Sequence, residues 1–510
     1  MKDHIHSAAR YCMVLLACLL AAACSRLAEE DETHAEAAHV SVAEQTAGPT
    51  PFIVNLALRL EEFANLDSVS YTVAAKPGTF SKPVAVTYTR ARLERTGAWN
   101  AAGKRLSFAV FGLYANYQNG VTLIARFRDG STHVQPLTIA APAYAGPATV
   151  YTTPEVRTPR TAAVSPGFDY MMLQNGVTTP AVLDTDGNLR WIGTEPVNSI
   201  SSLFNEDAFL VGSATTPVLY RVELNGSFVA RPLASTRYTN FHHDFVRGKI
   251  GYLAELDALE GGVPRIESIV AEVSETGEII KEWDMAAIFR AAMQAGGDDP
   301  SNFVRDGVDW FHMNSAIYVA ADDSLLISSR ENFVVKIDYA TGRIKWLLGD
   351  TTKHWYVDYP SLRALSLKLN SGKPPIGQHS LSIAGNGELL LFNNGYGSLN
   401  QPPDTSAGLT RDYSTPSRYA IDEHARTATE TWTYSPTPAI FSDICSSVYE
   451  GTAANHYLIT YSVAAARERT QLVALDSAGK IAFDYAYPAG GGCAVAFNSK
   501  AIDLSDLTLK

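Results

Sequence analysis

The sequence has no cluster of lysine and arginine residues, and its formal net charge at pH 7 is −12. Proteins that bind nucleic acid need a basic stripe or patch that neutralises phosphate groups. An acidic chain without such a patch is not built for that contact. We therefore exclude nucleic acid from the partners that we expect for this protein.

Cysteine is also scarce, because only Cys445 and Cys493 lie beyond residue 24. In an exported chain, two cysteines suggest one disulfide. The alternative is a pair of buried free thiols. The sequence leaves both arrangements open.

The apolar run at the N-terminus lacks the length to span a bilayer, since it covers only residues 11–23. Its length suits a secretory signal, and Lys2 and Arg10 supply a thin basic region before it. Small residues precede Cys24 as in a bacterial lipobox, although Ala21 stands where leucine is commoner. We expect a signal peptide over 1–23 and a lipid anchor on Cys24, with an unlipidated signal as the alternative.

Short strands and turns dominate the rest of the chain. Residues 24–50 are polar and acidic, which predicts a disordered tether. Residues 51–145 contain about seven short strand patterns separated by glycine, proline and asparagine, as in a β-sandwich. No cluster of catalytic residue types lies in that region.

A weak repeat runs through residues 146–510, in which a turn leads into a strand that ends on an aromatic residue. Six candidate ends of this kind occur, at Trp191, Asn225–Gly226, Trp283, Trp346, Trp432 and Phe483. The pattern predicts an all-β protein in which a six-bladed β-propeller follows the small sandwich. We expect two insertions, a short helix over Asp284–Gln294 and a loop over Gly395–Ser417 that covers the central funnel.

The best-defined blade pattern, residues 309–346, carries His312, Asn314 and Arg330. An arginine fork and a histidine on neighbouring strands are suited to hold an oxyanion. His379 begins a strand at the comparable place in the next blade, and His242 and His243 do so in the preceding one. Strand alternation lets only one of that pair face inward, and we favour His243.

Other interpretations of these histidines remain in view. A single histidine at the start of a strand is more often structural than functional. Three histidines could bind zinc, although the permanent cation of Arg330 beside a dication is unfavourable. A serine hydrolase has less support, because no Gly-x-Ser-x-Gly elbow occurs.

Several motifs together resemble the bacterial arylsulfate sulfotransferases: FHHD, DWFHMNS, ISSR, and QHS followed by NGELLLFNNG, in the family's order. FGLYANYQNGVTLIARF in the N-terminal region resembles the small β-sandwich of that family, so the resemblance runs from about Phe52 to the C-terminus. It implies a periplasmic enzyme, here a periplasmic or cell-envelope lipoprotein. Such an enzyme moves a sulfuryl group from a phenolic sulfate donor to a phenol acceptor without a nucleotide sulfate donor. A scheme built on a histidine nucleophile needs no metal, and we expect no cofactor.

The resemblance also implies roles for single residues. His379 would be the nucleophile that becomes sulfated, while His312, Asn314, Arg330 and one of His242 and His243 would bind the sulfate and phenol oxygens. The family's disulfide closes a short local loop, which the spacing of the two cysteines here does not match. We expect membrane contact only through a lipid anchor, and a homodimer stays open beside a monomer.

Three rival functions fit the same pattern. An aryl sulfate hydrolase would use the same site with water as the acceptor. A non-catalytic propeller lipoprotein would bind anions or act as a scaffold. A quinone-dependent dehydrogenase propeller would carry similar glycine–tryptophan turns together with bound calcium.

Overall fold

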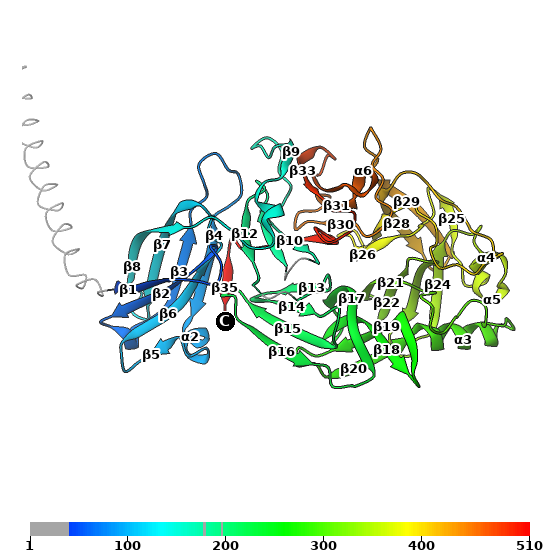
Figure 1. Cartoon of the computed structure of the whole chain (residues 1–510), viewed down its shortest axis with the longest axis horizontal. Helices are drawn as coiled ribbons and strands as arrows, with labels where there is room; N and C mark the ends of the chain where they lie inside the picture. The colour runs from blue at the N-terminus through cyan, green and yellow to red at the C-terminus, as the bar shows by residue number, and fades with distance from the viewer. Residues whose placement is uncertain (1–39, 177–179, 195–196) are drawn as a thin grey trace, which may run out of the picture.

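The computed structural model describes residues 40–176, 180–194 and 197–510. Strands dominate this part of the chain, and its helices are few and short. The expected all-β fold, a sandwich followed by a propeller, is confirmed (Figure 1). The expected signal peptide and Cys24 lie outside the described residues. No helix within the described ranges is long and apolar enough to cross a membrane.

Two sheets form the sandwich at the left of Figure 1. The first has the order β1 (Val40–Ala47), β2 (Ile53–Leu60), β6 (Arg105–Phe111), β5 (Trp99–Asn100). The second has the order β35 (Leu507–Leu509), β4 (Val84–Thr89), β3 (Leu66–Val73), β7 (Tyr117–Phe127), β8 (Thr132–Ala141). Buried and more exposed residues alternate along β4 and β7, because only one face of the sheet meets the core.

Two predicted domain boundaries need correction. Residues 40–47, expected within the disordered tether, form strand β1, which pairs with β2 along its length. Residues 507–509, expected in the propeller, form β35, which pairs in parallel with β4 of the sandwich. Both strands join partners that their own short sequences do not specify.

Six further sheets of the described residues form the propeller. We call each of these sheets a blade and give its strands in order from the innermost to the outermost. Blade 1 is β34 (Asn498–Ile502), β10 (Tyr170–Gln174), β11 (Ala181–Asp184), β12 (Leu189–Ile192); blade 2 is β13 (Ser202–Asn205), β14 (Ala208–Gly212), β15 (Val218–Glu223), β16 (Phe228–Pro232); blade 3 is β17 (Tyr238–Arg247), β18 (Tyr252–Glu260), β19 (Val263–Val273), β20 (Ile279–Asp284). Blade 4 is β21 (Met313–Val319), β22 (Ser324–Ser329), β23 (Phe333–Asp338), β24 (Ile344–Gly349); blade 5 is β26 (His379–Ile383), β27 (Leu389–Asn393), β28 (Thr415–Asp422), β29 (Thr427–Thr433), β25 (Lys368–Ser371); blade 6 is β30 (Ser447–Glu450), β31 (Tyr457–Val463), β32 (Arg469–Leu475), β33 (Ile481–Pro488), β9 (Glu155–Thr158).

The aromatic residue that ends the outer strand of a blade packs against the next blade. Trp191 of blade 1 stacks on Phe209 of blade 2 at 4.6 Å between ring centroids. Trp283 of blade 3 donates its indole N–H to the Tyr339 carbonyl beyond β23, at 3.1 Å. These contacts bury large rings between sheets, which stabilises the order of the blades.

The ring is closed by β34, a late strand that pairs with β10 and so completes blade 1. The innermost strands of successive blades contact one another around the centre, from β13 through β17, β21, β26 and β30 to β34. The colour sequence in Figure 1 follows this path, with red strands beside cyan ones at the closure. Residues at the start of these strands therefore share one end of the channel.

Few helices interrupt the sheets of the described residues. They are α2 (Arg90–Arg95), α3 (Met285–Ala295), α4 (His354–Val357), α5 (Pro360–Arg363) and α6 (Ala464–Arg467), with 3-10 turns η1 (Phe63–Asn65) and η2 (Thr149–Thr152). The predicted helix α3 is confirmed, since the Asp284 side chain accepts a hydrogen bond from Ala287 N at 3.2 Å. Its buried face consists of Met285, Ala286, Phe289 and Met293, whereas Ile288 and Ala292 are only partly covered.

The two domains are joined by a buried polar contact. Arg190 of blade 1 is fully buried, donates through Nε to the Gly112 carbonyl of the sandwich at 3.1 Å and pairs with Asp184. Its guanidinium lies 3.7 Å from the centroid of the Tyr114 ring. A buried arginine needs such partners, because its desolvation is otherwise strongly unfavourable.

Candidate active site

Irregular innermost strands bring three histidines to one end of the ring. Pairing slips between Phe241 and Phe245 in blade 3, between Met313 and Ser315 in blade 4, and between His379 and Ser382 in blade 5. Left-handed backbone occurs at each place, with φ of 46° at His243, 49° at His312 and 58° at Ser380. Such φ values are uncommon outside glycine, and they re-aim the local side chains.

His379 is buried and its imidazole is held on both sides. Nδ1 lies 3.0 Å from the Gly377 carbonyl and 2.9 Å from Asn394 Oδ1, while the main-chain N–H of Cys445 donates to Nε2 at 3.2 Å. Two acceptors at Nδ1 and a donor at Nε2 assign the proton to Nδ1. Nε2 therefore carries the lone pair.

The charge state of His379 follows from the same surroundings. Burial lowers the pKa of His379 well below its usual value, and the nearby charges of Arg330 and His243 lower it further. The neutral imidazole is thus the stable form at neutral pH. A neutral histidine with an unprotonated nitrogen can act as a nucleophile.

His312 has the opposite charge state. Its Nδ1 lies 2.5 Å from Asp309 Oδ2 and 2.9 Å from Glu267 Oε2. Burial lowers the pKa of His312, but the charge of Glu267 and the hydrogen bond to Asp309 outweigh it and raise the pKa to about 10. Burial alone would raise the pKa of Glu267, yet His243 and His312 lower it overall, so the pair is an imidazolium and a carboxylate.

Of the two adjacent histidines in blade 3, His243 is the one that faces this group. Its ring centroid lies 4.9 Å from that of His312, and burial lowers the pKa of His243 to about 3. The His242 ring turns the other way, with Nδ1 3.0 Å from His243 Nδ1 and 3.6 Å from Glu255 Oε2. His242 is therefore placed behind His243.

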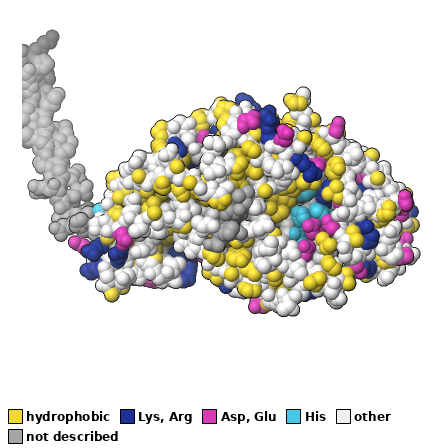
Figure 2. All heavy atoms as spheres, viewed as in Figure 1, with side chains coloured by type: hydrophobic (Ala, Val, Ile, Leu, Met, Phe, Trp, Pro, Cys, Tyr) yellow, Lys and Arg dark blue, Asp and Glu magenta, His cyan; other side chains and the backbone are white. Residues whose placement is uncertain are grey.

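Arg330 is buried at the end of β22, and its main-chain N–H donates to the His312 carbonyl at 3.0 Å. Its Nη1 donates to Glu331 Oε1 at 2.9 Å, while Nε and Nη2 have no hydrogen-bond partner among the residues that the structure describes. A buried guanidinium with two unpaired nitrogens is ready to bind an anion. Figure 2 shows histidine side chains on this face of the propeller beside acidic side chains.

Asn314 occupies the predicted strand, but its amide is used between blades. Nδ2 donates to the Gln378 carbonyl at 2.8 Å, and Gln378 Nε2 donates to the Ser329 carbonyl at 2.8 Å. These bonds join the strand that carries Arg330 to the residue before His379. In this arrangement Asn314 positions the site, and its Oδ1 is buried without a partner.

Several residues of the site carry no signal in the sequence. Phe497 lies between two of the histidines, with its ring centroid 5.4 Å from His243 and 6.0 Å from His379. Asn394 is the exception, because it belongs to the NGELLLFNNG motif that follows His379 in the sequence and contacts His379 Nδ1 in the structure. Glu267 comes from β19, and nothing in its sequence context distinguishes it from other glutamates.

Two groups of residues bring ligand atoms within 4.8 Å of one another, as a metal site would: His242 with His243 and Glu255, and His243 with Glu267 and His312. In the second group, His312 Nδ1 already lies between two carboxylates with a pKa of about 10. A metal ion would have to displace that proton. The donor set therefore favours a proton over a metal at His312.

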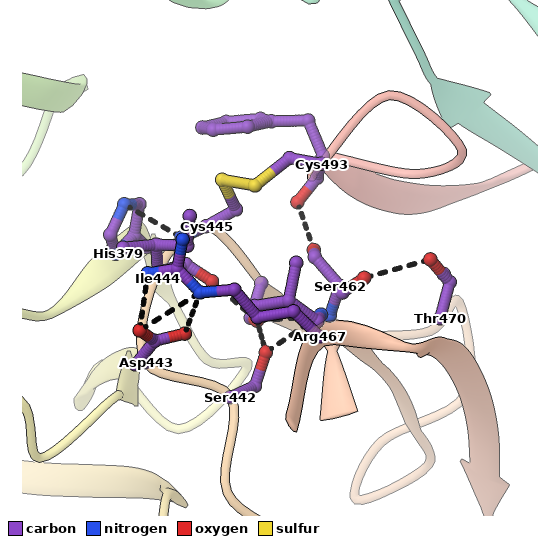
Figure 3. The surroundings of a disulfide bond; sticks show 12 residues. His379, Ser442, Asp443, Ile444, Cys445, Ser462, Arg467, Thr470 and Cys493 are labelled. Atoms are coloured by element: carbon purple, nitrogen blue, oxygen red, sulfur yellow. Dashed lines mark hydrogen bonds and ion pairs between the residues drawn. A yellow bond between two sulfur atoms is a disulfide. The ribbon is translucent and has the colours of Figure 1, made fainter. Parts of the chain in front are cut away.

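Cys445 and Cys493, for which a disulfide and two thiols were both open, are bonded to each other. The bridge links the segment before β30 to the segment before β34. Figure 3 shows Cys445 beside the His379 ring, with the sulfur bridge leading away to Cys493. A structural crosslink thus ends directly at the histidine site.

The chemistry of these groups is complementary. His379 Nε2 offers an unprotonated lone pair, His312 carries a proton, and Arg330 has guanidinium nitrogens without a partner among the described residues. Two titratable groups whose pKa values are pushed apart are typical of acid–base catalysis.

Comparisons with known proteins identify the family of both domains. A family model described as arylsulfotransferase (ASST) matches residues 155–487, and one described as the arylsulfotransferase Ig-like domain matches residues 61–142. Arylsulfate sulfotransferase AssT of Escherichia coli O6:H1 is 25% identical over 321 residues, 50% of this chain and 52% of that protein. The AssT of Lelliottia amnigena is 25% identical over 319 residues, again 50% and 52%.

The alignments span about half the length of these curated relatives. Among solved structures, selenomethionine-substituted virginiamycin B lyase from Staphylococcus aureus has a TM-score of 0.32 at 11% identity, over 67% of this chain and 90% of that one, and this likeness carries no argument. The family models are stronger evidence, because the larger of them matches most of the propeller. The chain belongs to the arylsulfotransferase family.

Proposed function

We propose that this protein is an arylsulfate sulfotransferase, which moves a sulfuryl group from a phenolic sulfate ester to an acceptor phenol. One observation carries the proposal: the neutral His379 lies in one site with the protonated His312 and the unpaired nitrogens of Arg330. The name of the curated relatives supports the same reaction class.

The first half-reaction in this proposal transfers the sulfuryl group to His379. The Nε2 lone pair forms a bond to sulfur, while the bond from sulfur to the aryl oxygen breaks and leaves its electron pair on that oxygen. His312 gives its proton to the departing phenolate. Arg330 Nε and Nη2 bind the sulfate oxygens, whose negative charge would otherwise repel the nucleophile.

The second half-reaction reverses these steps with another phenol. The acceptor gives its hydroxyl proton to the now neutral His312, and its oxygen attacks sulfur as the bond to Nε2 breaks. Asn394 Oδ1 accepts a hydrogen bond from His379 Nδ1–H throughout, which fixes the tautomer that presents Nε2. The scheme needs only groups of this chain and the two substrates.

The experiment treats the protein with a chromogenic aryl sulfate, with and without added phenol. We expect phenol to accelerate release of the chromogenic alcohol and to become sulfated itself. Without acceptor, intact-mass analysis should find one added sulfuryl group, which peptide mapping places on His379. In His379→Ala the label and the transfer should both fall by several powers of ten, whereas His354→Ala, outside the site, serves as the histidine control.

Three outcomes would redirect the proposal. Equal release with and without phenol would identify an aryl sulfate hydrolase. A label on His312 or His243 would exchange the roles of the histidines. Sulfated phenol without any labelled enzyme would replace the covalent route by direct transfer between two bound phenols.

We also propose that the protein is exported and anchored by lipid on Cys24. Lys2, Arg10 and the apolar run before Cys24 support export, and a disulfide is typical of compartments outside the cytoplasm. Mass spectrometry of the membrane fraction should find acylated Cys24 as the first residue. An unmodified N-terminus beyond Cys24 in a soluble fraction would reject the anchor.

A further inference from the structure

The main chain at Cys445 touches the reactive nitrogen of the site. Its N–H donates to His379 Nε2 at 3.2 Å, and this nitrogen must form the bond to sulfur in the proposed function. When Nε2 gives up its lone pair to sulfur, the N–H loses its acceptor. The nearest acceptors are then the oxygens of the transferred group, because they are bonded to the atom that Nε2 has joined.

The backbone that presents this N–H has an unfavourable conformation. Cys445 and Ser446 are consecutive non-glycine residues with left-handed φ of 54° and 81°. Such residues persist only where the surrounding structure holds them, and they gather at functional sites.

Several hydrogen bonds and one covalent bond hold the turn. Asn394 Nδ2 donates to the Cys445 carbonyl at 2.9 Å, while Asn394 Oδ1 lies 2.9 Å from His379 Nδ1. Ser446 N donates to the Phe497 carbonyl at 3.0 Å, and the Ser446 carbonyl and Oγ accept from Ser380 Oγ at 2.8 Å and Ser462 N at 3.1 Å. At Cys445 itself, the side chain is held by the disulfide to Cys493, which alone joins the turn covalently to a distant segment.

The far end of the disulfide also reaches the site. Cys493 follows three glycines, Gly490 to Gly492, and precedes Phe497 by four residues. The Phe497 ring packs against both His379 and His243. The crosslink therefore connects two segments that contact His379, one through the Cys445 N–H and the other through the Phe497 ring. It also restrains the glycine-rich stretch, whose backbone is otherwise conformationally free.

We propose that the Cys445 main-chain N–H is a catalytic hydrogen-bond donor for the sulfuryl group, and that the Cys445–Cys493 disulfide positions it. The inference rests on the proposed function. In the resting enzyme the N–H orients the Nε2 lone pair, and in the transfer it donates to a sulfuryl oxygen as an oxyanion-hole donor does. Nothing in the side chain of Cys445 is needed except its bond to Cys493.

A dithiol reductant prepares the protein without the crosslink between Cys445 and Cys493. It converts the disulfide to two thiols and is itself oxidised to a cyclic disulfide. Cys493 is partly exposed, so the reagent reaches the bridge in the folded protein. Removal of the crosslink should leave the hydrogen bonds of Asn394 and Ser446 to hold a turn that is then populated only in part.

The test compares the oxidised protein, the dithiothreitol-reduced protein and Cys445→Ser/Cys493→Ser, far below their melting temperatures. The readouts are the single-turnover rate of His379 labelling by an aryl sulfate and the KM for that donor. Loss of one oxyanion donor lowers turnover by about 10²–10³. Because the N–H is displaced and not deleted, we expect the labelling rate to fall about 10- to 100-fold while the donor KM changes less than about twofold.

The controls separate positioning from general stability. Dithiothreitol should leave the rate of Cys445→Ser/Cys493→Ser unchanged, and reoxidation should restore the wild-type rate. Val69→Ala, in the sandwich core, lowers the melting temperature away from the site, and its labelling rate should match that of the wild type. Cys493→Ser alone should behave as the double variant, because it keeps every atom of the Cys445 main chain.

Two results would overturn the inference. One is an unchanged labelling rate after the bridge is opened. The other is an equal fall of the labelling rate in Val69→Ala, which would tie the loss to general stability and not to the position of the Cys445 N–H. If instead the oxidised wild type labels no histidine and sulfates no phenol, the proposed function itself fails, which this design distinguishes from a failure of the disulfide's role.

Discussion

At the scale of single residues, one site holds two histidines in opposite charge states. His312 keeps its proton because Glu267 and Asp309 surround its Nδ1. His379 stays neutral because it is buried beside Arg330 and accepts a hydrogen bond at Nε2. In the proposed reaction, these neighbours would assign the roles of acid and nucleophile to two side chains of the same type.

This division predicts the pH dependence of the transfer. The acid His312 must be protonated, so the single-turnover rate should hold through neutral pH and fall as pH rises through about 10. Glu267 raises the pKa of His312, and Glu267→Gln removes that charge. The alkaline limb should therefore move to lower pH in Glu267→Gln.

The measurement is a pH–rate profile of His379 labelling for the wild type and two variants. Glu278→Gln, an exposed turn residue, is the control and should keep the limb of the wild type. A limb that stays in place in Glu267→Gln would show that His312 is not the group that titrates.

At the scale of elements, the long connection between β27 and β28 is docked onto the site. Both carboxylate oxygens of Glu331 accept from the main-chain N–H of Leu399, at 3.0 Å each, and Oε2 accepts from that of Asn400 at 2.9 Å. Asn400 Nδ2 donates to Asp309 Oδ2 at 3.1 Å. The connection is thus held by Glu331, which pairs with Arg330, and by Asp309, which pairs with His312.

Glu331→Gln should loosen this connection. A glutamine has one acceptor oxygen, so it leaves at least one of Arg330 Nη1 and the two loop N–H groups without an acceptor. Such a loss destabilises the docked loop by about 1–3 kcal/mol. Hydrogen exchange at Leu399 and Asn400 should accelerate accordingly.

A matched variant checks that the effect is local. Glu450→Gln also removes a carboxylate that accepts from main-chain N–H groups, those of Gly385 and Asn455. It should leave exchange at Leu399 and Asn400 unchanged. Equal exchange in Glu331→Gln and the wild type would mean that other contacts hold the loop.

The sequence predicts elements whose signals are local. The aspartate cap of α3 and the turn-to-tryptophan pattern at Trp191 and Trp283 mark structures that short stretches determine. His312 and His379 could be placed at one mouth because His312 directly precedes the innermost strand β21 and His379 begins β26. His243 was expected at the start of a strand but lies in the middle of β17, at the slipped pairing between Phe241 and Phe245.

The remaining site residues depend on long-range pairing. Phe497 reaches His379 only because β34 closes the ring, and Glu267 of blade 3 meets His312 at the start of the neighbouring blade 4. The bulges that turn His243 and His312 inward arise from slipped pairing with a neighbouring strand. A one-residue slip changes which face a side chain occupies, and no local pattern encodes it.

At the scale of the whole molecule, β35 ties the far end of the chain to the sandwich. It pairs in parallel with β4, and Thr89 Oγ1 donates to the Leu509 carbonyl at 2.9 Å. Leu509 is 2% exposed and belongs to the core shared by the sandwich and blade 1. The strand therefore contributes to the stability of a domain that begins hundreds of residues earlier.

Leu509→Ala should lower the free energy of unfolding by about 2–5 kcal/mol, because it leaves a cavity in that core. Leu507→Ala, on the same strand but only partly buried, is the control and should have a smaller effect. Calorimetry measures both, and His379 labelling should persist in each variant below its melting temperature. Equal losses for the two variants would show that β35 is attached mainly through its backbone.

The position of β34 and β35 in the sequence also fixes the order of events during synthesis. Residues 498–502 complete blade 1, and residues 507–509 complete a sheet of the sandwich, yet the ribosome makes them after every strand that they join. Neither domain can reach its final form before these late strands have been made. Until then, β10 and β4 each lack one neighbouring strand, and unpaired strand edges of this kind are prone to aggregation.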